Sequence, residues 1–262
     1  MDADDYLDAI ARESNVLADA AARAGLDASV PSCPGWTVAD LVDHVGNVQR
    51  WAARTVRTLT DARIDRDAMS EHPGPDALLE WFRAGAADLV DALHGADPGT
   101  VVWTFSRDRT VNFWFRRQAQ EVAVHRWDAA GAASASPEPI DRALAVDGVD
   151  EWLALSAGGR TPRMTGDGET VHLHCTDLDG DGDGGDDDDH GAVPGEEHAG
   201  EWLVTLMPDG PRVETIHAKG DVAARGTASD LDLYVWGRVD ADALEVFGDA
   251  ALLERFRRSG MH

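Results

Sequence analysis

The chain has few cysteines, and it lacks any long apolar run. Cys33 and Cys175 are its only cysteines, too few and too far apart in sequence for the disulfide framework of a small secreted protein. No apolar run approaches the roughly 20 residues that a membrane-spanning helix needs. The opening segment, MDADDYLDAI, is acidic, whereas a signal peptide starts with basic residues. We therefore expect a cytoplasmic protein that has no membrane partner.

Basic residues are also scarce. The 262 residues include 23 lysines and arginines, of which Lys219 is the only lysine, against 49 aspartates and glutamates. The resulting net charge of −26 excludes nucleic acid as a partner, because phosphates bind to basic surfaces. Hydrophobic residues make up 43% of the chain, which is typical of a folded globular protein.

The first part of the chain shows the apolar spacing of α-helices, with hydrophobic residues recurring every three or four positions. The expected helices cover about residues 3–24, 37–60, 78–93 and 111–130. Thr37 has the character of an N-cap, with Asp40 three residues later as its acidic partner. Four helices of this length joined by loops predict a four-helix bundle, which we assign to residues 1–133.

The pattern changes at residues 131–140, and a second domain is expected over residues 140–262. A helix should begin near Pro139, and three runs then alternate apolar and polar residues as antiparallel strands do. These runs are 170–177, 201–207 and 211–218, and helices are expected at about 229–236 and 250–257. The fold class is therefore mainly α, with a small α+β second domain.

An acidic insertion, DLDGDGDGGDDDD, covers residues 177–189. Asp177, Asp179 and Asp181, followed by Gly182, match the first half of an EF-hand loop. However, an aspartate stands where the bidentate glutamate is required, and the flanking runs have the pattern of strands. We therefore expect a solvated insertion between two strands rather than a calcium site.

A possible metal site combines the second and fourth helices. Glu121 and His125 are four residues apart, so their side chains share one face of a helix. His44 lies beside the apolar stripe of the second helix. Two histidines and a carboxylate leave an open coordination position, as in catalytic zinc sites. Spacing alone is also compatible with a surface hydrogen bond and a buried core histidine.

Three segments resemble the mycothiol-dependent maleylpyruvate isomerase family. They are PSCPGWTVADLVDHVGNVQRW (31–51), RRQAQEVAVHRWDA (116–129) and ASDLDLYVWGRVDADALEVFGDAALLERF (228–256). They occur in the family's order and fall in both expected domains. The resemblance implies a DinB-like metal-binding bundle followed by a sterol-carrier-protein-like α+β domain.

The resemblance also implies a site and a chemistry. His44, Glu121 and His125 would hold a divalent metal, most simply zinc, and mycothiol would bind at that metal. A metal-bound thiol loses its proton near neutral pH, and its thiolate would add to a double bond of a small anionic substrate and leave again after rotation. Arg238 matches a family arginine that would grip a substrate carboxylate. The alternative role for Arg238 is to cap the end of a short helix.

Other side chains have two interpretations each. Asp128 either orients His125 or forms an exposed ion pair. Cys33, in the loop before the second helix, either approaches the site or is a small buried hydrophobe, and we favour the buried hydrophobe. Arg116, Arg117 and Arg126 should mostly face solvent. Trp36, Trp127 and Trp236 either line the site or pack in the core. His172 and His174 alternate on one strand, and we place them on a solvated sheet face rather than at a metal.

Two other functions share this sequence pattern. One is a mycothiol S-transferase that removes electrophiles with the same three ligands. The other is a non-catalytic protein that holds a lipid or another small ligand. A small-molecule substrate and a low-molecular-weight thiol are the partners expected for the enzyme.

Overall fold

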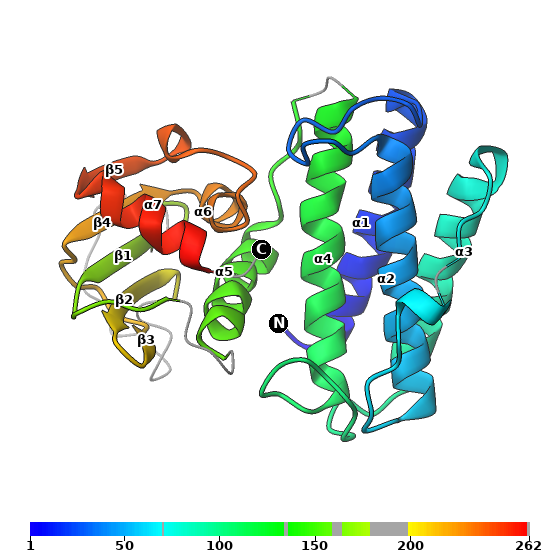
Figure 1. The fold of residues 1–262 in the computed structure, drawn as a ribbon, viewed down its shortest axis with the longest axis horizontal. Helices are drawn as coiled ribbons and strands as arrows, with labels where there is room; N and C mark the ends of the chain where they lie inside the picture. The colour runs from blue at the N-terminus through cyan, green and yellow to red at the C-terminus, as the bar shows by residue number, and fades with distance from the viewer. Residues whose placement is uncertain (70, 134–135, 159–163, 179–198, 261–262) are drawn as a thin grey trace, which may run out of the picture. The chain divides into compact units, whose positions relative to one another are not determined.

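The computed structural model describes residues 1–69, 71–133, 136–158, 164–178 and 199–260. The chain divides into two compact units, Met1–Ile140 and Asp141–His262, and each is considered by itself (Figure 1). Most of the acidic insertion, from residue 179 on, lies outside the described residues. None of the described helices combines the length and apolar character needed to cross a bilayer.

The first unit is a four-helix bundle, as the sequence predicts. Its α-helices in the described part of the chain are α1 (Ala3–Ala24), α2 (Val38–Thr58), α3 (Pro75–His94) and α4 (Val111–Ala132). Helix α1 packs against α3 and α4, and α2 packs against the same two helices. A short 3-10 helix, Asp67–Met69, lies between α2 and α3.

Local signals set the start of α2, the helix that carries His44. The Thr37 side chain accepts a hydrogen bond from the backbone N–H of Asp40, and the Asp40 carboxylate accepts one from the backbone N–H of Thr37. This capping box satisfies two amide groups that the first turn leaves without helical partners. The apolar face of α2 then packs into the bundle core through Leu41, Val42 and Val45.

The second unit combines three helices with a five-stranded sheet in its described part. Its elements are α5 (Arg142–Ala157), β1 (Thr170–Cys175), β2 (Glu201–Met207), β3 (Gly210–Glu214), β4 (Val222–Gly226), α6 (Ala228–Val235), β5 (Glu245–Gly248) and α7 (Ala250–Ser259). The strand order is β3-β2-β1-β4-β5, in which β1 and β4 are parallel and the other neighbours are antiparallel.

The sequence pattern predicted β1, β2 and β3 but not β4 and β5. The two missed strands read VAARG and EVFG, which are short and each contain a glycine, so neither shows a clear alternation. Their formation depends instead on long-range pairing, of β4 with β1 and of β5 with β4. The apolar face of the sheet packs on the helices, and Trp202 on β2 donates a hydrogen bond to Asp150 of α5 over 2.6 Å.

Candidate metal centre

Two helices bring His44, Glu121 and His125 together. The Glu121 Oε1 atom lies 3.2 Å from His44 Nε2 and 3.5 Å from His125 Nε2. One ligand atom from each of the three residues falls within 4.8 Å of the others. The i, i+4 spacing places Glu121 and His125 on one face of α4, and the packing of α2 on α4 adds His44.

Two further side chains orient the candidate ligands. Arg117 Nη2 donates to Glu121 Oε2 over 2.8 Å, so the other carboxylate oxygen faces the two imidazoles. Asp128 Oδ2 lies 2.8 Å from His125 Nδ1, which leaves Nε2 directed at Glu121. Asp128 is fully buried, so its position is that of an orienting residue rather than an exposed ion pair.

The electrostatics of the cluster favour the charged forms of both α4 residues. Burial alone would raise the pKa of Glu121, but hydrogen bonds with His125 and His44 and the charge of Arg117 hold it well below its usual value. Burial alone would lower the pKa of His125, but Asp128 and Glu121 raise it to about 8. Below about pH 8, the His125 ring is therefore protonated in the absence of metal.

The loop before α2 closes over the same group. Ser32 Oγ donates to Asp128 Oδ1 over 2.5 Å, and Cys33 Sγ lies 3.5 Å from Asp128 Oδ2. Of the two interpretations of Cys33, the favoured one, a small buried hydrophobe, is wrong, because the residue is only partly buried and its thiol contacts a carboxylate beside the site. Ser32 and Cys33 thus fix Asp128, and Asp128 fixes His125.

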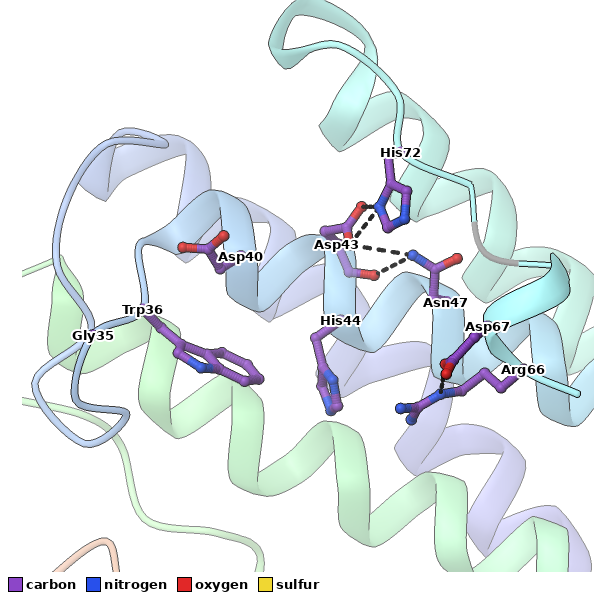
Figure 2. A pocket seen from close by; sticks show the side chains of 9 residues that line it. All are labelled: Gly35, Trp36, Asp40, Asp43, His44, Asn47, Arg66, Asp67 and His72. Carbon is purple, nitrogen blue, oxygen red and sulfur yellow. Dashed lines mark hydrogen bonds and ion pairs between the residues drawn. The ribbon is translucent and has the colours of Figure 1, made fainter.

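A pocket of about 460 Å³ opens beside His44. It is lined by Gly35, Trp36, Asp40, Asp43, His44, Asn47, Arg66, Asp67 and His72. His44 extends toward α4 in Figure 2, and its Nε2 atom lies 3.2 Å from Glu121 Oε1 of that helix. The Trp36 ring centroid is 5.0 Å from that of His44 and 6.4 Å from that of His125. Trp36 therefore lines the site.

Several residues that line this pocket were not predicted from the sequence. Asp43 lies 3.0 Å from His72 Nδ1 and accepts a hydrogen bond from Asn47, as the dashed lines in Figure 2 show. Arg66 forms an ion pair with Asp67 at 3.9 Å. The Asp43–Asn47 spacing of four residues could indicate a shared helix face. His72 and Arg66 come from the segment between α2 and α3, where no motif marks them.

Two arginines near the ligands are buried, contrary to expectation. Arg117 bonds to Glu121, as described above, and is almost fully buried. Arg126 is also buried and donates to Glu13 of α1 over 2.7 Å, and its remaining N–H groups donate to the carbonyls of Glu138 and Pro139. Both guanidinium groups can be buried because carboxylate and carbonyl oxygens accept their hydrogen bonds, which offsets the cost of removing the charge from water.

In the second unit, Arg238 follows α6, and its Nη1 donates to the carbonyl oxygen of Trp236 over 2.7 Å. This is the bond expected of a side chain that caps a helix end. Its guanidinium is only partly buried. Trp236 itself is a buried residue of this unit.

The expectation of a solvated face at His172 and His174 is wrong. Both side chains are buried, and both lie near the Glu201 carboxylate, at 3.0 and 3.2 Å. Burial lowers the pKa of His172, with smaller opposing effects from Glu201 and reinforcing ones from the neighbouring histidines. Alternation along the strand correctly puts the two histidines on one face, but it does not report what covers that face.

Comparison with known proteins identifies both units. The family described as mycothiol maleylpyruvate isomerase N-terminal domain matches residues 7–130, and the MDMPI C-terminal domain matches residues 143–255. Comparison with curated proteins gives no match.

Two similar crystal structures are both of the mycothiol-dependent maleylpyruvate isomerase, one of them a histidine-to-alanine mutant. Each matches this chain with a TM-score of 0.61, and each match covers 94% of this chain and 93% of the chain in the crystal structure. The sequence identity is 15% for the unmutated enzyme and 13% for the mutant. The fold is therefore shared over nearly the whole length. With family matches to both units, the chain belongs to the mycothiol maleylpyruvate isomerase family.

Proposed function

We propose that this chain is a divalent-metal-dependent enzyme that uses mycothiol to isomerise a small anionic substrate. The observation that carries the proposal is the convergence of His44 Nε2, Glu121 Oε1 and His125 Nε2 beside a pocket. Membership of the family supports the use of mycothiol, since the related structures are of a mycothiol-dependent enzyme.

The donor set fits a divalent ion. Two imidazoles and one carboxylate are ligands of catalytic zinc, and they leave a position for a further ligand. Other divalent metals accept the same donors, and zinc is the simplest choice. When bound, the metal supplies a Lewis acid that lowers the pKa of a coordinated thiol.

The chain's own residues prepare this position. Asp128 holds the Nδ1 side of His125, and Arg117 holds the outer oxygen of Glu121, so both ligands keep one orientation. Trp36 packs beside the two imidazoles. Arg66, which forms an ion pair with Asp67, lines the same pocket.

The metal assignment is tested by elemental analysis of purified protein. Glu121→Ala should lose one divalent ion per chain relative to the unchanged protein. Glu80→Ala, which removes an exposed glutamate of α3, is the matched control and should retain the full content. Equal metal content in the two variants would show that Glu121 is not a ligand.

The reaction is tested with maleylpyruvate, with and without mycothiol, in metal-loaded protein. Isomerisation that requires both thiol and metal supports the proposal. A stable thiol adduct of an electrophile, without isomerisation, would identify an S-transferase instead. Loss of activity in Glu121→Ala but not in Glu80→Ala would link the reaction to the metal centre.

We also propose that Arg238 binds the anionic group of the substrate. Arg238→Ala should retain its metal and lose about 10–100-fold in kcat/KM, because a hydrogen bond to a charged group contributes about 1.5–3 kcal/mol. Arg212→Ala, at an exposed position of β3, is the control. An unchanged kcat/KM in Arg238→Ala would leave Arg238 with the capping role alone.

A further inference from the structure

The second unit gathers three histidines and a glutamate on one face of its sheet. His172 and His174 are two residues apart on β1, so they point to the same side. Glu201 of β2 pairs directly with His174 in the antiparallel register. His217 follows the end of β3 by three residues. None of these residues belongs to the centre between α2 and α4.

The three imidazoles converge on one oxygen atom. Glu201 Oε2 lies 3.0 Å from His172 Nε2, 3.2 Å from His174 Nδ1 and 2.6 Å from His217 Nδ1. The ring centroids are 5.7–6.0 Å apart, and each pair of rings is inclined at 75–88°. The rings therefore surround a common point without stacking on one another.

These separations are close to those of a tetrahedral metal site. Donors bonded to zinc at about 2.0–2.2 Å in a tetrahedron lie about 3.3–3.6 Å from one another. The three histidine-to-glutamate separations are 2.6–3.2 Å, and all four ligand atoms fall within 4.8 Å. Small side-chain rotations bring four such atoms to bonding distance around one ion.

Hydrogen bonding alone accounts for the arrangement less well. A carboxylate oxygen has two lone-pair directions, yet three ring nitrogens approach the same oxygen of Glu201. A cation placed among the four donors attracts every one of them. His172 and His174 are buried, whereas the His217 side chain is 66% exposed. An ion can therefore reach the cluster from solvent on the side where His217 lies.

We propose that His172, His174, Glu201 and His217 form a second metal site that holds a divalent transition-metal ion such as zinc. Four protein ligands close the coordination sphere, which is the property of a structural site rather than a catalytic one. The ion ties β1 and β2 to the segment after β3. It stabilises the second unit because the folded chain binds it and the unfolded chain lacks the assembled site.

The test starts from His125→Ala, which weakens the first centre, and uses zinc alone as the probe. His217→Ala and His94→Ala are then introduced separately into that background. Both histidines are exposed, and His94 lies at the end of α3, far from the cluster in sequence and in the other unit. The pair therefore separates site binding from the general affinity of surface imidazoles for zinc.

Calorimetric titration should give one zinc per chain in the His125→Ala protein and in its His94→Ala derivative. The His217→Ala derivative should bind at least about 100-fold more weakly, since even orienting partners of ligands are worth about 10–100-fold in affinity. Zinc should also raise the Tm of the first two proteins and not of the third. Cobalt should give the intense visible bands of a tetrahedral site in the first two only.

A second variant protects the test against misfolding. Glu201→Gln keeps the size of the side chain and should remove the cobalt bands while the far-ultraviolet circular dichroism stays unchanged. Absence of zinc binding in the His125→Ala protein would overturn the proposal. Equal titrations of the His217→Ala and His94→Ala derivatives would overturn it as well, because they would leave the four-residue cluster without a metal.

Discussion

At the scale of single residues, His125 is the most constrained side chain of the candidate metal centre. Its Nδ1 faces Asp128 and its Nε2 faces Glu121, and both carboxylates favour a protonated ring. Burial opposes that charge, but the two carboxylates outweigh it and raise the pKa of His125 to about 8. A metal must therefore displace a proton from this residue.

Zinc affinity at the first centre should consequently depend on pH. Below about pH 8, each unit of acidification should weaken zinc binding by about tenfold, because one proton competes for His125. Calorimetry in the His217→Ala background measures this centre alone. A flat affinity between pH 6 and pH 8 would contradict the raised pKa of His125.

The same group links the stability of the metal-free protein to pH. The folded pKa of His125 lies above its ordinary value of 6.5, so the protonated ring stabilises the fold. That contribution is complete below about pH 6.5 and is lost as the pH rises through about 8. Asp128→Asn removes one of the carboxylates and should reduce this loss, as measured by urea unfolding of metal-free protein at pH 6 and pH 9.

Asp128→Asn should also weaken zinc binding by about 10–100-fold, because it replaces the partner that orients His125. Asp27→Asn, at a position in the loop between α1 and α2, is a control for the change in charge. If the two variants bind zinc equally well, Asp128 does not act through His125. A retained circular dichroism spectrum would exclude unfolding as the cause.

At the scale of elements, the approach of α3 to α2 requires the absence of a side chain at Gly46. A Cβ atom built there would lie 2.2 Å from the Trp81 ring of α3. Trp81 is held in place, because its Nε1 donates to Glu71 and the Arg50 guanidinium lies 3.8 Å from its ring centroid. Gly46 is two residues from His44, so the two residues lie on different faces of α2, one toward α3 and the other toward α4.

Gly46→Ala should lower the free energy of unfolding by about 1–3 kcal/mol, the usual cost of overpacking a close contact. Gly95→Ala, at the end of α3, is the control, because a Cβ there meets only the Asp91 carbonyl at an ordinary 3.6 Å. Urea unfolding followed by circular dichroism measures both variants. Equal midpoints would show that Trp81 moves aside at no cost.

At the scale of the whole molecule, the net charge of −26 opposes compaction. Surface ion pairs such as Arg83–Asp19 at 2.6 Å and Arg57–Asp88 at 2.7 Å offset only part of this repulsion. With 49 acidic against 23 basic residues, most carboxylates lack a cationic partner by number alone. Repulsion should therefore dominate the response of stability to salt.

Raising the salt concentration from about 10 mM to about 100 mM should increase the Tm, because the Debye length shortens from about 30 Å to about 10 Å. Each kcal/mol of repulsion removed corresponds to about 2–4 °C for chains near this size. Calorimetry at constant pH, with an uncharged osmolyte at equal osmolarity as the control, measures the effect. A Tm that falls with salt would show that ion pairs outweigh repulsion.

The helices of the bundle, the three alternating strands and the family could all be predicted from the amino-acid sequence. This was possible because helical spacing, the Thr37–Asp40 cap and the CPGW and EVAVHRWD segments are local features of the chain. Local spacing also grouped Glu121 with His125. It left β4 and β5 unrecognised, since their short runs form strands only through pairing with distant residues.

Which distant side chains meet depends on the packing of the whole chain and could not be predicted from local sequence. This packing placed Arg117, Asp128 and Cys33 around the candidate ligands, where helix packing and a loop bring them together. It also buried His172 and gathered His217 with Glu201, because strand register and the path of the chain after β3 are long-range properties. Periodicity reports which side of an element a residue faces, whereas burial and ligand geometry depend on what the rest of the fold places opposite it.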